Sequence, residues 1–168
     1  MYEYGDDEVI KFDRADFLVG RNAEHREFHD HAICKEFFGE YILDTKLVHS
    51  PNGKRLVEIQ PRVTGHYLGV VDMKEPQIAA QFKNIVEAYR KLKEAGYPEI
   101  DLMGQGGAFS RCLSNIFVLP DGSLRIIDAS LLDDGYVDSW IGKSVIRWLR
   151  RRVVKHQTKT IAMLLTAI

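Results

Sequence analysis

Cysteine and proline are scarce in this sequence, and no hydrophobic run in it is long. Its 168 residues include two cysteines, Cys34 and Cys112, and five prolines. Two cysteines are too few for a disulfide scaffold, which favours a reducing compartment. The last apolar run, residues 161–168, is too short to span a bilayer, and no charged start followed by an apolar stretch indicates a signal peptide. We therefore expect a cytoplasmic protein with no membrane partner.

Net charge is also nearly absent, but the charges are unevenly placed. With 24 acidic and 23 basic residues, the chain has no overall field that selects nucleic acid or membrane. Residues 1–44 hold 12 acids and five bases, whereas residues 141–168 hold seven bases and no acid. The two ends can attract each other, or the basic end can form an interaction surface. The hydrophobic share of 45% is that of an ordinary globular domain and excludes disordered and collagen-like chains.

Strand-like and helix-like patterns occur in blocks, which favours an α+β fold. Residues 2–12, 41–60 and 115–127 each have the pattern of a β-hairpin, with glycine, asparagine or aspartate at the turn. Helical patterns cover residues 22–38, with Asn22 as the cap, and residues 76–95. A tail helix is expected over residues 139–165, with Trp140 and Trp148 as its core anchors.

The strongest candidate for a chemical site lies between Ser114 and Asp128. Asn115 opens one strand of the predicted hairpin and Asp128 follows the other, so antiparallel pairing should bring the two side chains together. An amide oxygen beside a carboxylate suits a hard cation such as Mg²⁺. The alternative is that both side chains only cap backbone groups, which is common at turns.

A second candidate is Lys11, which alternates with apolar residues on its predicted strand. Glu27 lies on the largely apolar side of the next helix, where a carboxylate is costly unless it has a partner. The two can pair, although Glu24 competes for the lysine. A lysine held in this way is a point charge suited to phosphate oxygens.

In this order, the segments resemble the protein-kinase-like superfamily, in its short bacterial, aminoglycoside-phosphotransferase-like form. The resemblance spans about residues 2–135 and is carried by VIK at 9–11, NAEHRE at 22–27, RLVEIQPRVTG at 55–65 and SNIFVLPDGSLRIID at 114–128. It implies a reduced two-lobe fold within one domain. Residues 1–62 would form a lobe of one small antiparallel sheet and a helix, and residues 63–168 a truncated, mainly helical lobe with a β-hairpin.

The same resemblance implies a phosphotransferase that uses ATP and Mg²⁺ on a hydroxyl of a protein or small molecule. Lys11 would hold the nucleotide phosphates and Glu27 would orient Lys11. Asn115 and Asp128 would hold Mg²⁺.

The sequence departs from the family pattern in two places that matter for catalysis. The family's glycine-rich phosphate loop precedes the lysine strand, but only ten residues precede Lys11. The phosphates would therefore lose this lid of backbone donors, or a partner chain would supply it. The usual position of the catalytic aspartate, five residues before Asn115, holds Ser110, which cannot accept a proton as a carboxylate can. Asp101 can replace it only if residues 104–113 form an inserted loop.

These departures keep two alternatives open. One is a catalytically inactive kinase-like module that binds or regulates. The other is a nucleic-acid-binding protein that contacts phosphates through Arg147 and residues 150–152.

Overall fold

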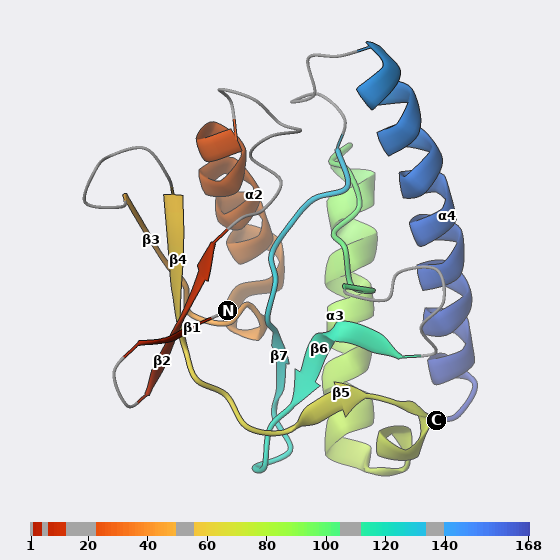
Figure 1. The fold of residues 1–168 in the computed structure, drawn as a ribbon. Coiled ribbons are helices and arrows are strands. Elements are labelled where there is room, and N and C mark those ends of the chain that lie inside the picture. Colours follow the sequence, from red (N-terminus) through yellow and green to blue (C-terminus); the bar gives the residue numbers. More distant parts are fainter. Residues whose placement is uncertain (1, 5–6, 13–22, 50–55, 105–111, 134–139) are drawn as a thin grey trace.

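The computed structural model describes residues 2–4, 7–12, 23–49, 56–104, 112–133 and 140–168. Within these residues the chain folds into two small antiparallel sheets and three α-helices (Figure 1). The prediction of a mixed α+β fold is therefore confirmed. The predicted cap Asn22, most of the turns at residues 5–7 and 50–53, and residues 105–111 of the proposed insertion lie outside the described residues.

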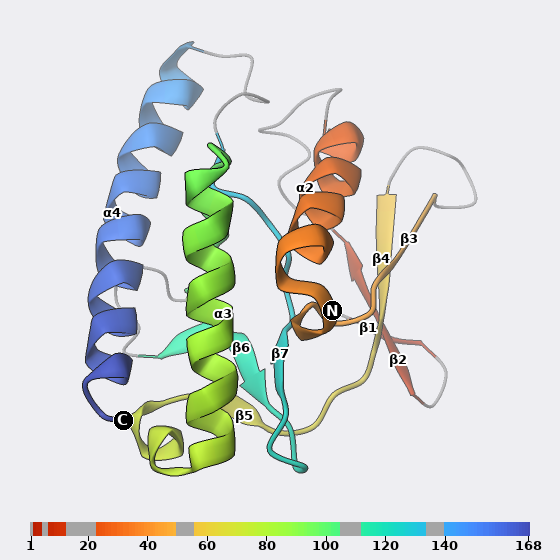
Figure 2. The ribbon, with the colours of Figure 1, turned by 180° about the vertical axis from the view of Figure 1, so that it is seen from behind.

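The first sheet has four strands in the order β1-β2-β4-β3. They are β1 (Tyr2–Tyr4), β2 (Glu8–Phe12), β3 (Lys46–His49) and β4 (Leu56–Pro61), and each neighbouring pair is antiparallel. Lys11 lies on β2 directly opposite Glu58 of β4. β4 ends at Pro61, which cannot donate a further ladder hydrogen bond. The helix α2 (Ala23–Phe38) lies beside this sheet in both views (Figures 1 and 2).

The prediction of a strand that begins at Tyr41 is wrong. Residues Gly39–Tyr41 instead form a short 3₁₀ helix, η2, in which Gly39 takes a φ of 56°. Ile42 then pairs with Ile126 in an isolated parallel bridge, and the amide of Leu43 donates to the carbonyl of Ile126 at 2.9 Å. This connection attaches the first sheet to the second before β3 begins.

The second sheet has three strands in the order β5-β6-β7. Strands β6 (Leu113–Val118) and β7 (Leu124–Ile126) form the predicted third hairpin, whereas β5 (His66–Leu68) is not predicted from the sequence. Gly65 allows β5 to approach β6, because a Cβ at this position would lie 2.0 Å from the carbonyl oxygen of Val118. A side chain here would therefore separate the two strands.

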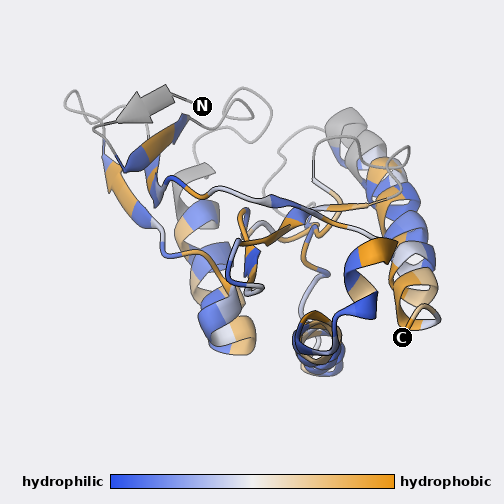
Figure 3. Ribbon diagram, turned by 90° about the horizontal axis from the view of Figure 1, so that it is seen from below, coloured by the Kyte–Doolittle hydropathy of each residue, from blue (hydrophilic) through white to orange (hydrophobic). Residues whose placement is uncertain are grey.

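The long helix α3 (Pro76–Glu94) carries one continuous buried stripe into the core. The stripe recurs every three or four residues, as expected for one helix face, and consists of Ile78, Phe82, Ile85, Tyr89 and Leu92. The helix α4 (Trp140–Leu165) runs alongside α3 and contributes Ile161 and Leu164 to the same core (Figures 1 and 2). Seen from below, both helices show a mixture of hydrophobic and hydrophilic residues (Figure 3).

Trp148 is not the core anchor that the sequence predicts. Its side chain is 54% exposed, and the guanidinium carbon of Arg152 lies 4.8 Å from its ring centre. The side chain of Trp140 lies outside the described part of the chain. In the described residues, no helix combines the length and the apolar character that a membrane crossing needs.

Candidate functional site

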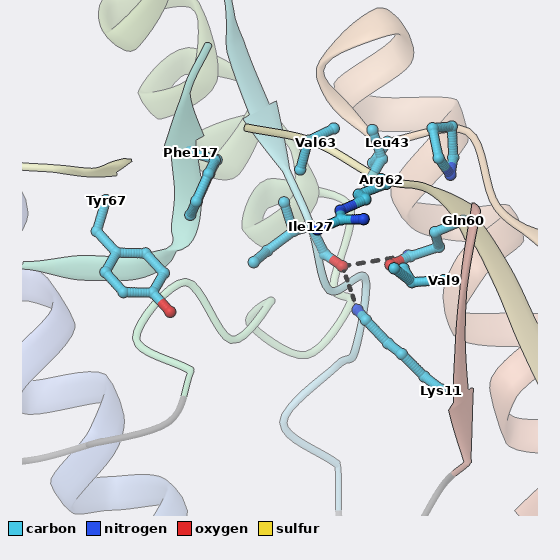
Figure 4. Close-up of a pocket in the computed structure, with 10 residues that line it drawn as sticks. Val9, Lys11, Leu43, Gln60, Arg62, Val63, Tyr67, Phe117 and Ile127 are labelled. Carbon is cyan, nitrogen blue, oxygen red and sulfur yellow. Dashed lines mark hydrogen bonds between the residues drawn. The ribbon is translucent and has the colours of Figure 1, made fainter. Parts of the chain in front are cut away.

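Lys11 connects the two sheets. Its ammonium donates a 2.6 Å hydrogen bond to the carbonyl oxygen of Ile127, which lies 116 residues later in the chain (Figure 4). The side-chain amide of Gln60, from β4, donates to the same oxygen at 3.2 Å and to the hydroxyl of Thr45 at 2.8 Å. Because Ile127 directly precedes Asp128, these contacts place Lys11 next to the backbone that carries Asp128.

Asp101 and Asn115, although fourteen residues apart, are in direct contact. The side-chain amide of Asn115 donates a 2.7 Å hydrogen bond to the backbone carbonyl of Asp101. The backbone amide of Asp101 donates to the carbonyl of Ser130 at 2.9 Å, and that of Ile127 donates to the carbonyl of Asn115 at 2.9 Å. Hydrogen bonds therefore join the segments that carry Asp101, Asn115 and Asp128. An inserted loop at residues 104–113 would need the two residues that flank it, Asp101 and Asn115, to lie this close together.

Gly104 makes the position of Asn115 possible. It has a φ of 59°, and a Cβ added to it would lie only 2.2 Å from Oδ1 of Asn115. The missing side chain leaves room for that oxygen against the backbone of Gly104, and the amide nitrogen of Asn115 donates to Asp101. Asn115 itself is buried. Residues 105–111, including Ser110, lie outside the described residues.

The carboxylate of Asp101 is held by its own loop. Its Oδ1 accepts hydrogen bonds from the backbone amides of Met103 at 2.9 Å and Gly104 at 3.1 Å. Burial raises the pKa of Asp101 above its ordinary value, and these two hydrogen bonds lower it by less. A carboxylate with a raised pKa is a better proton acceptor than an exposed aspartate.

Glu27 lies on the side of α2 that faces the first sheet. It lines a cavity of about 10 Å³ together with Glu58 and Gln60 of β4, and with His31, Thr45, Leu47 and Ala129. A space of this size holds about one water molecule. The side chain of the competing residue Glu24 lies outside the described part of the chain, so the partner of Lys11 on α2 stays open between the two.

Asp30, which the sequence analysis did not single out, ties α2 to the segment after Asp128. It is only 1% exposed, and its Oδ2 accepts a 3.0 Å hydrogen bond from the backbone amide of Leu131. Burial, and next the nearby carboxylates of Asp30 and Asp128, raise the pKa of the Cys34 thiol. The sequence could have identified Asp30, because this residue lies on the same side of α2 as Glu27 and Cys34.

A larger cavity of about 380 Å³ opens beside Lys11 (Figure 4). At its mouth Tyr67 meets Phe117 edge to face, with ring centres 5.2 Å apart. The walls come from both sheets and from the connection between them, and consist of Val9, Lys11, Leu43, Gln60, Pro61, Arg62, Val63, Tyr67, Phe117 and Ile127. Two of these cavity residues could have been identified from the alternation of side chains along a strand. Val9 lies on the same strand face as Lys11, and Phe117 lies on the same strand face as Asn115.

The predicted magnesium ligands, Asn115 and Asp128, do not line this cavity but lie next to Ile127, which does. Asn115 carries an amide oxygen and Asp128 a carboxylate, both of them oxygen ligands of the kind that Mg²⁺ prefers. The described residues contain no group of three or more histidine, cysteine or acidic side chains placed to hold a metal ion. Magnesium bound to a nucleotide needs only one or two protein carboxylates, because phosphate oxygens and water complete its shell.

Two of the arginines predicted to contact nucleic acid differ in exposure. Arg150 forms a 2.8 Å ion pair with Glu99, so its charge is already used within the protein. Arg152 is exposed on α4 beside Trp148. Nucleic-acid binding through the tail helix stays a prediction.

Comparison with protein-family models, with curated proteins and with solved structures finds no match for this chain.

Proposed function

We propose that this protein binds ATP with Mg²⁺ and transfers the terminal phosphoryl group to a hydroxyl of a protein or small molecule. The observation that carries the proposal is the hydrogen bond from Lys11 to Ile127, directly before Asp128, beside a 380 Å³ cavity. This bond supports the proposal because it brings the ammonium of Lys11 to a residue that directly precedes Asp128 and whose amide donates to the backbone of Asn115. The proposal includes the reduced two-lobe, kinase-like architecture and a cytoplasmic location.

The volume and lining of the large cavity support a small-molecule occupant with an apolar part. Its volume falls within the range of about 300–1,000 Å³ that is usual for small-molecule pockets. Val9 from the first sheet and Phe117 from the second supply apolar walls on either side. The nucleobase would lie between them, with the phosphates directed toward Lys11.

Lys11, Asn115 and Asp128 would hold the phosphates and the metal. An ammonium has three donors, so Lys11 can keep its bond to Ile127 and still donate to phosphate oxygens. Magnesium held by Asn115 and Asp128 would neutralise charge on the transferred group. Most catalysis of phosphoryl transfer comes from such positioning and electrostatics.

Asp101 is the candidate that would accept the proton of the acceptor hydroxyl. Its contact with Asn115 places it beside the proposed metal site, and its raised pKa suits proton transfer. A glycine-rich phosphate loop from a partner chain would close the site over the phosphates.

An inactive, nucleotide-binding module is the second candidate, and one observation favours it. Oδ1 of Asp101 already accepts two backbone hydrogen bonds within a largely buried loop, which restricts its access to an acceptor. In this case nucleotide would bind without transfer.

Thermal unfolding with Mg·ATP, followed by a phosphotransfer assay, separates the two candidates. We expect Mg·ATP to raise the unfolding temperature of the wild type and much less that of Lys11→Met. Loss of one charge-assisted hydrogen bond costs about 1.5–3 kcal/mol of binding free energy. Lys46→Met is the matched control, because Lys46 lies in the same sheet and its side chain forms an exposed ion pair with Glu8.

A temperature shift with transfer supports the enzyme, and a shift without transfer to a panel of hydroxyl acceptors supports the inactive module. Absence of any shift in the wild type contradicts both.

A further inference from the structure

Gln157 of α4 is completely buried, and both ends of its side-chain amide are used on one short stretch of backbone. Its Oε1 accepts a 2.8 Å hydrogen bond from the backbone amide of Leu102. Its Nε2 donates to the backbone carbonyl of Ile100 at 3.1 Å. The residue between these two contacts is Asp101.

These contacts complete a set that fixes the backbone around Asp101 from three directions. Asn115 of β6 binds the carbonyl of Asp101, and Ser130 accepts a hydrogen bond from the amide of Asp101. Gln157 binds the peptide groups on either side. With the backbone held in this way, the carboxylate is left only its own side-chain rotations, and the amides of Met103 and Gly104 restrict these.

The chemistry of the surroundings makes this arrangement specific to glutamine. Gln157 lies one turn before Ile161, on the face of α4 that enters the core. An apolar residue there would suffice to pack the helix, whereas a buried amide costs free energy unless each polar atom is paired. Only a side chain with one donor and one acceptor can satisfy Ile100 and Leu102 together.

We propose that Gln157 is a positioning residue that holds the carboxylate of Asp101 in the orientation needed to accept a proton. This inference rests on the proposed function for its catalytic consequence, but the orientation of Asp101 can be measured without it. It makes α4 part of the catalytic apparatus, although α4 contributes no residue to the large cavity described above.

Gln157→Met and Arg150→Met form a matched pair of test variants. Methionine approximates the shape of glutamine and removes both hydrogen bonds. Arg150 lies on the same helix and contacts the same segment through Glu99, so its replacement loosens α4 without touching the peptides beside Asp101. Gln157→Glu is a second variant, which keeps the acceptor for Leu102 and loses the donor to Ile100.

The first measurement is hydrogen exchange, followed by NMR, at the backbone amides of Met103 and Gly104, which donate to the Asp101 carboxylate and therefore report its orientation. We expect faster exchange at both amides in Gln157→Met, because the backbone around Asp101 is loosened, and unchanged exchange in Arg150→Met. Unchanged exchange in Gln157→Met overturns the inference, and so does an equal increase in both variants. Should Gln157→Met fail to fold, unprotected exchange of the Leu102 amide in the wild type overturns it instead.

The second measurement is the split between binding and turnover. Gln157→Met should leave the Kd for Mg·ATP unchanged and lower kcat by about tenfold to a hundredfold, the usual effect of a misplaced catalytic group. Gln157→Glu should fall between Gln157→Met and the wild type. Equal losses in Gln157→Met and Arg150→Met contradict a positioning role. If the wild type binds no Mg·ATP, the proposed function fails, while hydrogen exchange at Met103 and Gly104 still decides whether Gln157 orients Asp101.

Discussion

At the scale of single residues, alanine substitutions at Gly104 and Gly96 distinguish the cost of backbone strain from damage to the proposed metal site. Both have positive φ angles, 59° and 85°, but a Cβ at Gly96 meets nothing within 4 Å, whereas at Gly104 it collides with Asn115. Alanine at either position should cost about 1–2 kcal/mol of backbone strain. We expect Gly104→Ala to cost more than Gly96→Ala and to weaken binding of Mg·ATP.

Urea denaturation and nucleotide titration of the two variants measure these effects. Equal stability losses, or an unchanged Kd for Mg·ATP in Gly104→Ala, would show that Gly104 does not seat Asn115.

The buried carboxylate of Asp101 should reduce stability at neutral pH. Since its folded-state pKa is raised, folding favours the protonated form. The protonated carboxyl of Asp101 therefore stabilises the fold fully at pH values below the ordinary pKa of an aspartate. This stabilisation is lost as the pH rises through the folded-state pKa. Asp101→Asn keeps the oxygen that accepts from Met103 and Gly104, carries no charge, and should therefore be more stable than the wild type at neutral pH.

Unfolding free energies of Asp101→Asn and the wild type between acid and neutral pH test this. The advantage of the variant should shrink as the pH falls, and phosphoryl transfer should be lost throughout. A difference in stability that does not change with pH would argue against the raised pKa.

At the scale of elements, a buried hydrogen bond from the amide of Leu131 to Asp30 attaches α2 to the segment after Asp128. Asp30→Ala leaves the amide of Leu131 without this carboxylate, and an unpaired buried donor costs about 1–3 kcal/mol of unfolding free energy. Glu36→Ala, at an exposed position of the same helix, is the control and should have little effect.

Hydrogen exchange at Leu131 reports directly on this contact. We expect faster exchange in Asp30→Ala than in Glu36→Ala, and similar rates in the two variants would contradict the attachment.

The helices and hairpins with strong local signals could be predicted from the sequence. The stripe of α3 repeats every three or four residues between Pro76 and Gly96, and the hairpin from β6 to β7 turns at Asp121 and Gly122. β5 could not be predicted, because its three residues pair with β6 across more than forty intervening residues. The predicted strand at Tyr41 was wrong because Gly39 begins a 3₁₀ turn and Ile42 pairs with β7 instead.

Lys11 and Asn115 could be singled out from the sequence because a charged or an amide side chain stands out against an apolar strand pattern, and their role in a site stays a prediction. Asp30 and Gln157 act through hydrogen bonds to backbone groups far away in the chain, at Leu131 and at Ile100 and Leu102. Such contacts depend on tertiary packing, and a polar residue on a helix gives no local sign of its partner.

At the scale of the whole molecule, the two sheets meet at Ile127. Lys11 and Gln60 from the first sheet both donate to its carbonyl, while its amide belongs to the pairing with Asn115 in the second. A ligand held by residues of both sheets would bind only the folded state and stabilise it by mass action. The proposed binding of nucleotide would therefore depend on the complete fold.

The most direct test of the central claim is calorimetric titration of the wild type and Asp128→Asn with ATP, with and without Mg²⁺. We predict that the wild type binds ATP, and that removal of Mg²⁺ or of the Asp128 charge weakens binding by about tenfold or more, equivalent to about 1.4 kcal/mol. The two losses should not add, because they remove the same interaction. Binding that is indifferent to both Mg²⁺ and Asp128, or no binding at all, would contradict the account.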